Sequence, residues 1–219
     1  MKKLLTVALL LAGFLPASSA RAQVFGQYAP AEVLAVNSRL AGAYVGLSEN
    51  VVGMLAQLRL SFHPNVDFGF QGGLMREDVP PPKDGDPRIR KTMLQLGTDF
   101  RFGVARASES LPVDIAVGAG LGVGTSDNYH VLRFGPTGVA SRTFAMSSSA
   151  SIAPYAGVML SFASRDWGGR SESDFSIPLR LGAELRAIPG VRVTAELQLR
   201  LGDDFNDHTA FTGGVNLPF

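Results

Sequence analysis

The strongest constraint on this chain is an alternation of apolar and polar residues at every second position. Between Val191 and Leu201, the odd-numbered residues are Val, Ala or Leu, and the even-numbered ones are Arg, Thr, Glu or Gln. Successive side chains of a β-strand point to opposite faces of the sheet, so this stretch predicts a strand with one apolar face. The same alternation precedes the turn sequence Ile188-Pro189-Gly190, over residues 173–187. A turn of odd length pairs the two strands without exchanging their faces.

Periodic segments of about ten residues, separated by turn residues, are typical of transmembrane β-strands. The sequence predicts ten of them: residues 39–48, 51–62, 66–75, 92–104, 112–124, 135–146, 151–163, 173–187, 191–202 and 208–219. Residues 135–146 fit least well, because Ser141 and Arg142 interrupt both faces. We expect an all-β protein, a closed antiparallel up-and-down transmembrane β-barrel of ten strands. Eight strands are the alternative, if two weak segments are loops.

A soluble barrel shows the same alternation with its faces reversed, so two further patterns are needed to choose between them. Aromatic residues gather near predicted strand ends: Phe62, Phe68 and Phe219 at one rim, and Phe162, Phe175 and Phe211 at the other. Short links (63–65, 107–111, 188–190) alternate with longer polar ones (76–91, 164–173, 203–207). Outer-membrane barrels have aromatic girdles, short periplasmic turns and longer outer loops. Both patterns therefore favour the membrane barrel.

The first residues have the layout of an export signal. A basic start precedes the apolar run Leu4–Leu15, and Ala20-Arg21-Ala22 supplies small residues where a signal peptidase cleaves. The run is shorter than the roughly 20 residues of a transmembrane helix. We expect a signal peptide over residues 1–22 and one barrel domain over residues 23–219.

Composition excludes several classes of function. The chain has no cysteine, which excludes disulfides, thiolate metal sites and a lipid-modified N-terminal cysteine. Its basic residues are scattered and matched by acidic ones, so no nucleic-acid partner is expected. No residue cluster indicates a cofactor or a metal ion.

The chain also ends in a recognisable pattern. Apolar residues occupy alternate positions up to a terminal aromatic: Phe211, Val215, Leu217 and Phe219. This pattern resembles the C-terminal insertion signal of bacterial outer-membrane proteins, which implies that the barrel-assembly machinery recognises the last strand. Two positions depart from the usual signal, Pro218 and Gly213.

In general plan the chain resembles the small bacterial outer-membrane barrels of the OmpA, OmpX and OmpW type, over nearly the whole length expected after cleavage. The resemblance is architectural and carries over no catalytic residue. It implies export through the periplasm with the help of chaperones, a location in the bacterial outer membrane, and contact with lipid and lipopolysaccharide.

Charged residues share the polar parity and are expected to face the lumen as a network: Arg59, Asp99, Arg101, Arg180, Glu184, Arg186, Arg192, Glu196 and Arg200. Pairing Ala187 with Val191 brings opposite charges of two strands into diagonal contact. These pairs are Glu184 with Arg192 and Glu196 with Arg180. Because a barrel of eight to ten strands is only wide enough for side chains, we expect the network to plug the lumen. The alternative is a charged constriction that selects solutes.

A row of glycines shares the inward parity of one strand: Gly118, Gly120, Gly122 and Gly124. We expect these glycines to make room for long Arg side chains that cross the lumen. The alternative is that they line an open channel. The segment 76–91 contains three consecutive prolines, which favour a stiff extended loop. A protective loop and a partner-binding loop both fit it.

These features predict a structural or surface-interaction barrel with a largely plugged, charge-paired lumen. A narrow porin-like channel for small solutes is the alternative, and an outer-membrane enzyme a remote one. Asp207 and His208 partly resemble the catalytic pair of the omptin proteases, in which a His follows an Asp by two residues. Here the two residues are adjacent and would face opposite sides of a strand, so no enzyme is expected. His63 and His130 are isolated and are expected to be loop residues.

Overall fold

The computed structural model describes residues 27–48, 51–79, 89–167, 169–201 and 209–219. The predicted signal peptide over residues 1–22 lies outside the described residues. No helix in the described ranges is long and apolar enough to cross a membrane. The strands are β1 (Arg39–Leu47), β2 (Val51–His63), β3 (Val66–Val79), β4 (Ile89–Ala105), β5 (Asp114–Ser126), β6 (Tyr129–Ser141), β7 (Phe144–Ala145), β8 (Ser151–Met159), β9 (Ser161–Trp167), β10 (Arg170–Ile188), β11 (Val191–Leu201) and β12 (Thr209–Pro218).

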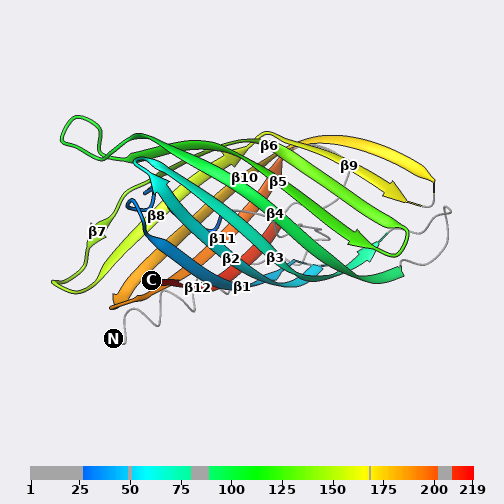
Figure 1. Ribbon diagram of the computed structural model, residues 1–219, viewed down its shortest axis with the longest axis horizontal. Helices are drawn as coiled ribbons and strands as arrows, with labels where there is room; N and C mark the ends of the chain where they lie inside the picture. Colours follow the sequence, from blue (N-terminus) through cyan, green and yellow to red (C-terminus); the bar gives the residue numbers. More distant parts are fainter. Residues whose placement is uncertain (1–26, 49–50, 80–88, 168, 202–208) are drawn as a thin grey trace.

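Antiparallel pairing runs around a complete ring, with β12 paired to β1 and β10 to β11. Figure 1 shows the long, tilted strands from the side. β8 and β9 are two parts of one wall strand, because both pair with β6 and with β10 in one unbroken register. Leu160 N donates to Pro136 O at 3.0 Å, but proline has no N–H to return, so the ladder is interrupted there. β7 is a two-residue extension paired with β8. The closed ten-stranded barrel is therefore confirmed, and the eight-stranded alternative is wrong.

The turn between β10 and β11 differs from the predicted one. Ile188 pairs with Val191, so Pro189 and Gly190 form a two-residue turn, with Gly190 at φ 74°. The predicted odd-length turn is wrong, yet the faces are preserved. A register shift between Leu185 and Ile188 inserts the extra residue, as a β-bulge does, and restores the expected pairing beyond it.

Several strands are longer than their alternation predicts, mainly at the end of the barrel away from the C-terminus. β5 and β6 pair as far as Ser126 and Tyr129, and a tight turn joins them with Asn128 at φ 55°. β3 and β4 stay paired as far as Val79 and Ile89, so both flanks of the expected loop 76–91 are strand. The expected loop 164–173 is likewise paired strand in large part. The prediction of long loops at this end is wrong in these places. Once a hairpin has begun, polar residues continue the strand pairing as well as apolar residues do.

The remaining boundary difference concerns β6. The expected strand 135–146 begins earlier, at Tyr129, and its later part is divided into β6, which ends at Ser141, and β7, while Arg142 N still donates to Pro154 O of β8. Phe144 and Ala145 of β7 pair with β8 in the same register as β6, and Met146 N donates to Ala150 O, so a short turn joins β7 to β8 at the C-terminal end of the barrel.

The wall has the predicted polar inner face and apolar outer face. The charged side chains at 59, 67, 99, 101, 180, 184 and 196 are buried, whereas large apolar side chains on every wall strand are exposed. Outward residues are apolar over runs of about eleven residues, 52–62, 113–123, 152–162 and 175–185, which matches the 9–11 residues that a tilted strand needs to cross a bilayer. At the edge of this band nearest the β9–β10 hairpin, three exposed aromatic rings lie in contact. The ring centroid of Phe162 is 5.6 Å from that of Phe134 and 5.1 Å from that of Phe175. An apolar belt with an aromatic edge is the exterior of a protein surrounded by hydrocarbon.

Two neighbouring glycines of β12 test how closely the inner face is packed. A Cβ on inward Gly214 would lie 2.1 Å from the Tyr44 ring and 2.5 Å from Ala43 O, whereas a Cβ on outward Gly213 meets only ordinary contact. We expect Gly214→Ala to lower the free energy of unfolding by about 1–3 kcal/mol, as overpacking does. Gly213→Ala is expected to change it by less than about 0.5 kcal/mol. Urea titrations of both variants in detergent micelles measure the difference, and equal effects would contradict the packing of Tyr44 over β12.

Candidate functional site in the lumen

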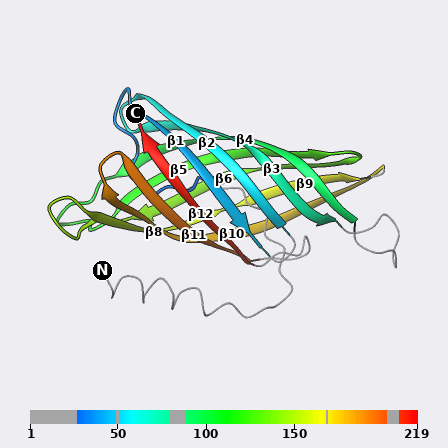
Figure 2. The ribbon, with the colours of Figure 1, turned by 90° about the horizontal axis from the view of Figure 1, so that it is seen from below.

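The lumen holds a stretch of the chain itself. Residues 27–37, called the inner segment from here on, run from the interior of the barrel, where the first residues are buried, to residues 35–37, which are exposed, and then into β1 (Figure 2). Tyr28, Ala29 and Ala31 are buried. This arrangement was not predicted from the sequence. It places a non-repetitive segment where only side chains were expected.

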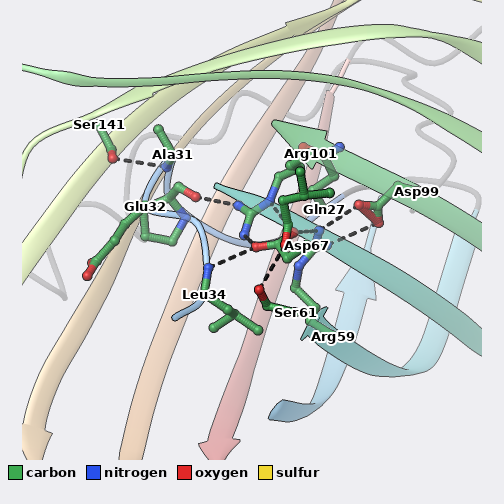
Figure 3. Close-up of polar contacts among 12 residues, drawn as sticks. Gln27, Ala31, Glu32, Leu34, Arg59, Ser61, Asp67, Asp99, Arg101 and Ser141 are labelled. Atoms are coloured by element: carbon green, nitrogen blue, oxygen red, sulfur yellow. Dashed lines mark hydrogen bonds and ion pairs between the residues drawn. The ribbon is translucent and has the colours of Figure 1, made fainter. Parts of the chain in front are cut away.

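The wall holds the middle of the inner segment through its main chain. Arg101 Nη1 donates to Pro30 O at 2.5 Å, and Ala31 N donates to Ser141 Oγ at 2.9 Å. Leu34 N donates to Asp67 Oδ2 at 3.1 Å, as Figure 3 shows. Three strands, β3, β4 and β6, therefore provide side chains that satisfy main-chain groups of the inner segment.

The inner segment's first residues reach the other strands. The Tyr28 ring lies 4.6 Å from the Tyr44 ring of β1. Gln27 Nε2 donates to Thr137 Oγ1 of β6 at 3.1 Å, and Gln57 Nε2 of β2 donates to Gln27 O at 3.3 Å. Together with the contacts described above, these place the inner segment against strands on several sides of the barrel.

A first charge cluster lies on β2, β3 and β4. Arg59 pairs with Asp67 at 2.5 Å and with Asp99 at 2.8 Å, and Arg101 pairs with Asp67 at 2.7 Å. All of these side chains are almost completely buried. Because each carboxylate has at least one guanidinium partner, the cluster avoids the cost of several kcal/mol that an unpaired buried charge carries. All charged members of the cluster lie on these three neighbouring strands, on one side of the wall.

A second charge cluster lies on β8, β10 and β11, across the lumen from the first in the strand order. Glu196 accepts hydrogen bonds from Tyr155 at 2.8 Å and from Gln198 at 2.7 Å. Glu184 pairs with Arg186 at 2.8 Å and with Arg192 at 3.5 Å. The cluster joins the inner segment through Arg186 and Glu32, 2.6 Å apart.

Arg180 of the second cluster is buried but incompletely satisfied. Its Nη1 lies 3.8 Å from Glu196 Oε2, and among the described residues neither Nη atom has a hydrogen-bond partner. A Cβ on Gly157 would lie 2.9 Å from Nη2, so a glycine makes room for this guanidinium. The Arg180–Glu196 and Glu184–Arg192 contacts are the diagonal pairs that the register predicts.

The predicted network therefore divides into two groups: Arg59, Asp99 and Arg101 in the first cluster, and Arg180, Glu184, Arg186, Arg192 and Glu196 in the second. The side chain of Arg200 lies outside the described residues. Asp67 forms two of the ion pairs, with Arg59 and Arg101, and so links β2, β3 and β4, although the predicted network did not rank it among its main members. The sequence predicted a plug made of side chains alone. The structure instead has two charge clusters on the wall, with the inner segment between them.

The glycine row faces inward as expected, but its purpose differs at Gly118. A Cβ there would lie 1.9 Å from Phe100 O of the neighbouring strand. The close approach of β4, and not an arginine side chain, requires glycine at this position. Arginines are accommodated by other glycines, at Gly69 beside Arg59 and at Gly157 beside Arg180.

The other candidates do not form a site in the described residues. His63 Nδ1 lies 3.0 Å from Pro64 O, and His130 Nδ1 lies 2.8 Å from Thr125 Oγ1, both on the exposed surface. The acidic segment with Asp207 and His208 lies outside the described residues, as do the three prolines of the segment 76–91. In the described part of the chain, no group of His, Asp or Glu residues could hold a metal ion.

The C-terminal pattern lies on β12 and beyond it. The outward side chains of this strand are exposed: Phe211, Val215, Leu217 and Phe219. Phe219 N donates to Arg39 O at 3.1 Å, so the chain ends against the start of β1. Recognition of these residues during assembly stays a prediction.

No family model and no curated protein match the chain. Among solved structures, LpxR from Salmonella typhimurium is 9% identical, over 82% of this chain and 99% of that chain, with a TM-score of 0.49. An outer membrane channel from Pseudomonas putida F1 is 12% identical over 90% and 100%, with a TM-score of 0.45. The outer membrane protein Ail from Yersinia pestis is 15% identical over 84% and 99%, with a TM-score of 0.36. The likeness is one of overall architecture.

Proposed function

We propose that this chain is a bacterial outer-membrane β-barrel whose lumen is closed to solutes by the inner segment and the two charge clusters. Its role is then structural or one of surface interaction, not transport. The observation that carries this proposal is the set of contacts from the inner segment to strands around the barrel, among them Arg101 to Pro30, Ser141 to Ala31 and Gln57 to Gln27.

The orientation follows from the two ends of the barrel. The C-terminus, the connection 106–113 and the turn between β7 and β8 share one end, and the hairpins β3–β4, β5–β6 and β9–β10 extend at the other (Figure 1). We place the first end in the periplasm, where the barrel-assembly machinery and chaperones act, and the hairpins outside, beside lipopolysaccharide. The predicted signal peptide provides the route of export.

Conductance in planar bilayers tests the closed lumen. We expect the refolded protein to show no steady openings, because an open pore of this diameter would have to bypass the buried inner segment. A gel of membrane fractions with and without boiling serves as the control, since a folded barrel migrates differently before boiling. Steady openings of the unmodified protein would overturn the closed lumen.

The narrow channel is the second candidate, and Arg180 favours it, because both of its Nη atoms lack hydrogen-bond partners in the described lumen. If the unmodified protein conducts, the variant Gly120→Trp separates a lumen pathway from a leak around the barrel. Openings that disappear in Gly120→Trp support a channel. Openings that persist point to an artefact of insertion.

A further inference from the structure

The contacts of the inner segment indicate more than a filled lumen. We propose that the wall of the barrel carries a binding site for peptide main chain, that residues 27–37 are its tethered occupant, and that this occupant leaves through the periplasmic mouth while the barrel stays folded. The inference rests on the proposed function and adds reversibility to it.

The first observation concerns what the wall uses to hold the inner segment. Arg101 binds the Pro30 carbonyl, and Asp67 and Ser141 accept main-chain N–H groups of the inner segment. A site that contacts carbonyl and amide groups recognises peptide main chain as a chemical class, as peptide-binding proteins do when main-chain hydrogen bonds provide affinity. Pro30 suits such a site, because it has no N–H to satisfy.

The second observation concerns what stays behind when the inner segment leaves. The pairs of Arg59 with Asp67, Arg59 with Asp99 and Arg101 with Asp67 all join wall residues. In the second cluster, Arg192 and Glu184, and Tyr155 and Glu196, are also wall partners. Removing the inner segment therefore leaves no carboxylate of either cluster without a wall partner, which is the condition for a wall that does not collapse.

The third observation concerns buried polar atoms in the described part of the chain, on the inner segment and on the wall, that lack hydrogen-bond partners. In the described residues, Gln27 Oε1 and both Nη atoms of Arg180 are buried without a hydrogen-bond partner. Unsatisfied buried polar atoms of this kind disfavour the seated state, since each would regain water on release. Burial of the Tyr28 ring against Tyr44 opposes release. The seated and released states are thus separated by a few contacts and not by the unfolding of the barrel.

Single cysteines test the inference in the full-length protein, because the chain has none of its own. Ala31 and Ala116 belong to one buried cluster, the first on the inner segment and the second on β5 of the wall. A maleimide coupled to a polyethylene glycol of several kilodaltons is too large to enter the lumen. In folded barrels, we expect Ala31→Cys to be modified at least about tenfold faster than Ala116→Cys, because local opening exposes only the first.

A second variant shows whether the anchor controls release. Tyr28→Ala in the Ala31→Cys background is expected to increase the labelling rate further, and Ala116→Cys with Tyr28→Ala is expected to stay protected. The gel with and without boiling shows for each sample that the barrel is folded.

The outcomes separate this inference from the proposed function. Equal protection of both cysteines, or labelling of Ala31→Cys only at the rate of global unfolding, overturns the releasable occupant and leaves the closed lumen intact. Steady conductance of the unmodified protein overturns the closed lumen directly. Labelling of Ala31→Cys with Ala116→Cys protected supports the inference.

Discussion

Arg59→Met is expected to lower the free energy of unfolding by about 3–5 kcal/mol, which is the cost of breaking a buried ion pair by removing one partner. Arg59 is completely buried and is the only partner among the described pairs that joins Asp99 to Asp67. Methionine keeps much of the side-chain volume, so the effect reports the charge and not a cavity. Urea titration in phospholipid vesicles, followed by the fluorescence of Trp167 and by gel migration, measures it.

Two further variants make this result specific. Asp99→Asn combined with Arg59→Met is expected to recover part of the loss, because it removes the carboxylate that the first change leaves without its guanidinium. Arg90→Ala removes an arginine from an exposed pair with Asp78 and is expected to change stability far less. A double variant no more stable than Arg59→Met would contradict the account of the first cluster.

Leu181→Arg is expected to lower the free energy of unfolding by about 2–4 kcal/mol in vesicles, the cost of an arginine near the bilayer midplane. Leu181 points outward from the centre of the apolar run 175–185 and is half exposed. In a soluble barrel the same change would place a charge in water and cost almost nothing. The measurement therefore tests which solvent surrounds the belt.

The matched control lies on the same strand. Ser171 also points outward from β10 but lies beyond the aromatic edge of the belt at Phe175. Ser171→Arg is expected to cost no more than about 1 kcal/mol, because the penalty falls toward the interface. Equal small effects of Leu181→Arg and Ser171→Arg would remove the basis for a membrane location.

The sequence predicted the faces of the wall well, because alternation is a property of each strand alone. In β2, for example, the buried parity of Gln57 and Arg59 follows directly from the pattern. The contacts of Arg180 with Glu196 were predictable for a related reason, since a hairpin register determines diagonal neighbours. Strand ends were predicted less well. The alternation becomes weak where outward residues turn polar, although pairing continues, as in β6 from Tyr129 onward.

The inner segment could not be predicted from periodicity, because it has none. The wall holds it largely through main-chain groups such as Pro30 O and Leu34 N, which every residue type offers. One signal was present in the sequence. Residues 23–38 contain a single charged residue, Glu32, which is too few for a tail in water and indicates burial.

The seam between β1 and β12 has a consequence for the order of assembly. Tyr44 lies over Gly214 and hydrogen bonds to Asn216, so residues near opposite ends of the chain meet there. Contacts so distant in sequence form late. A growing chain has no enclosed interior until its final strand arrives, so the inner segment gains its full set of wall contacts only once β12 has paired with β1.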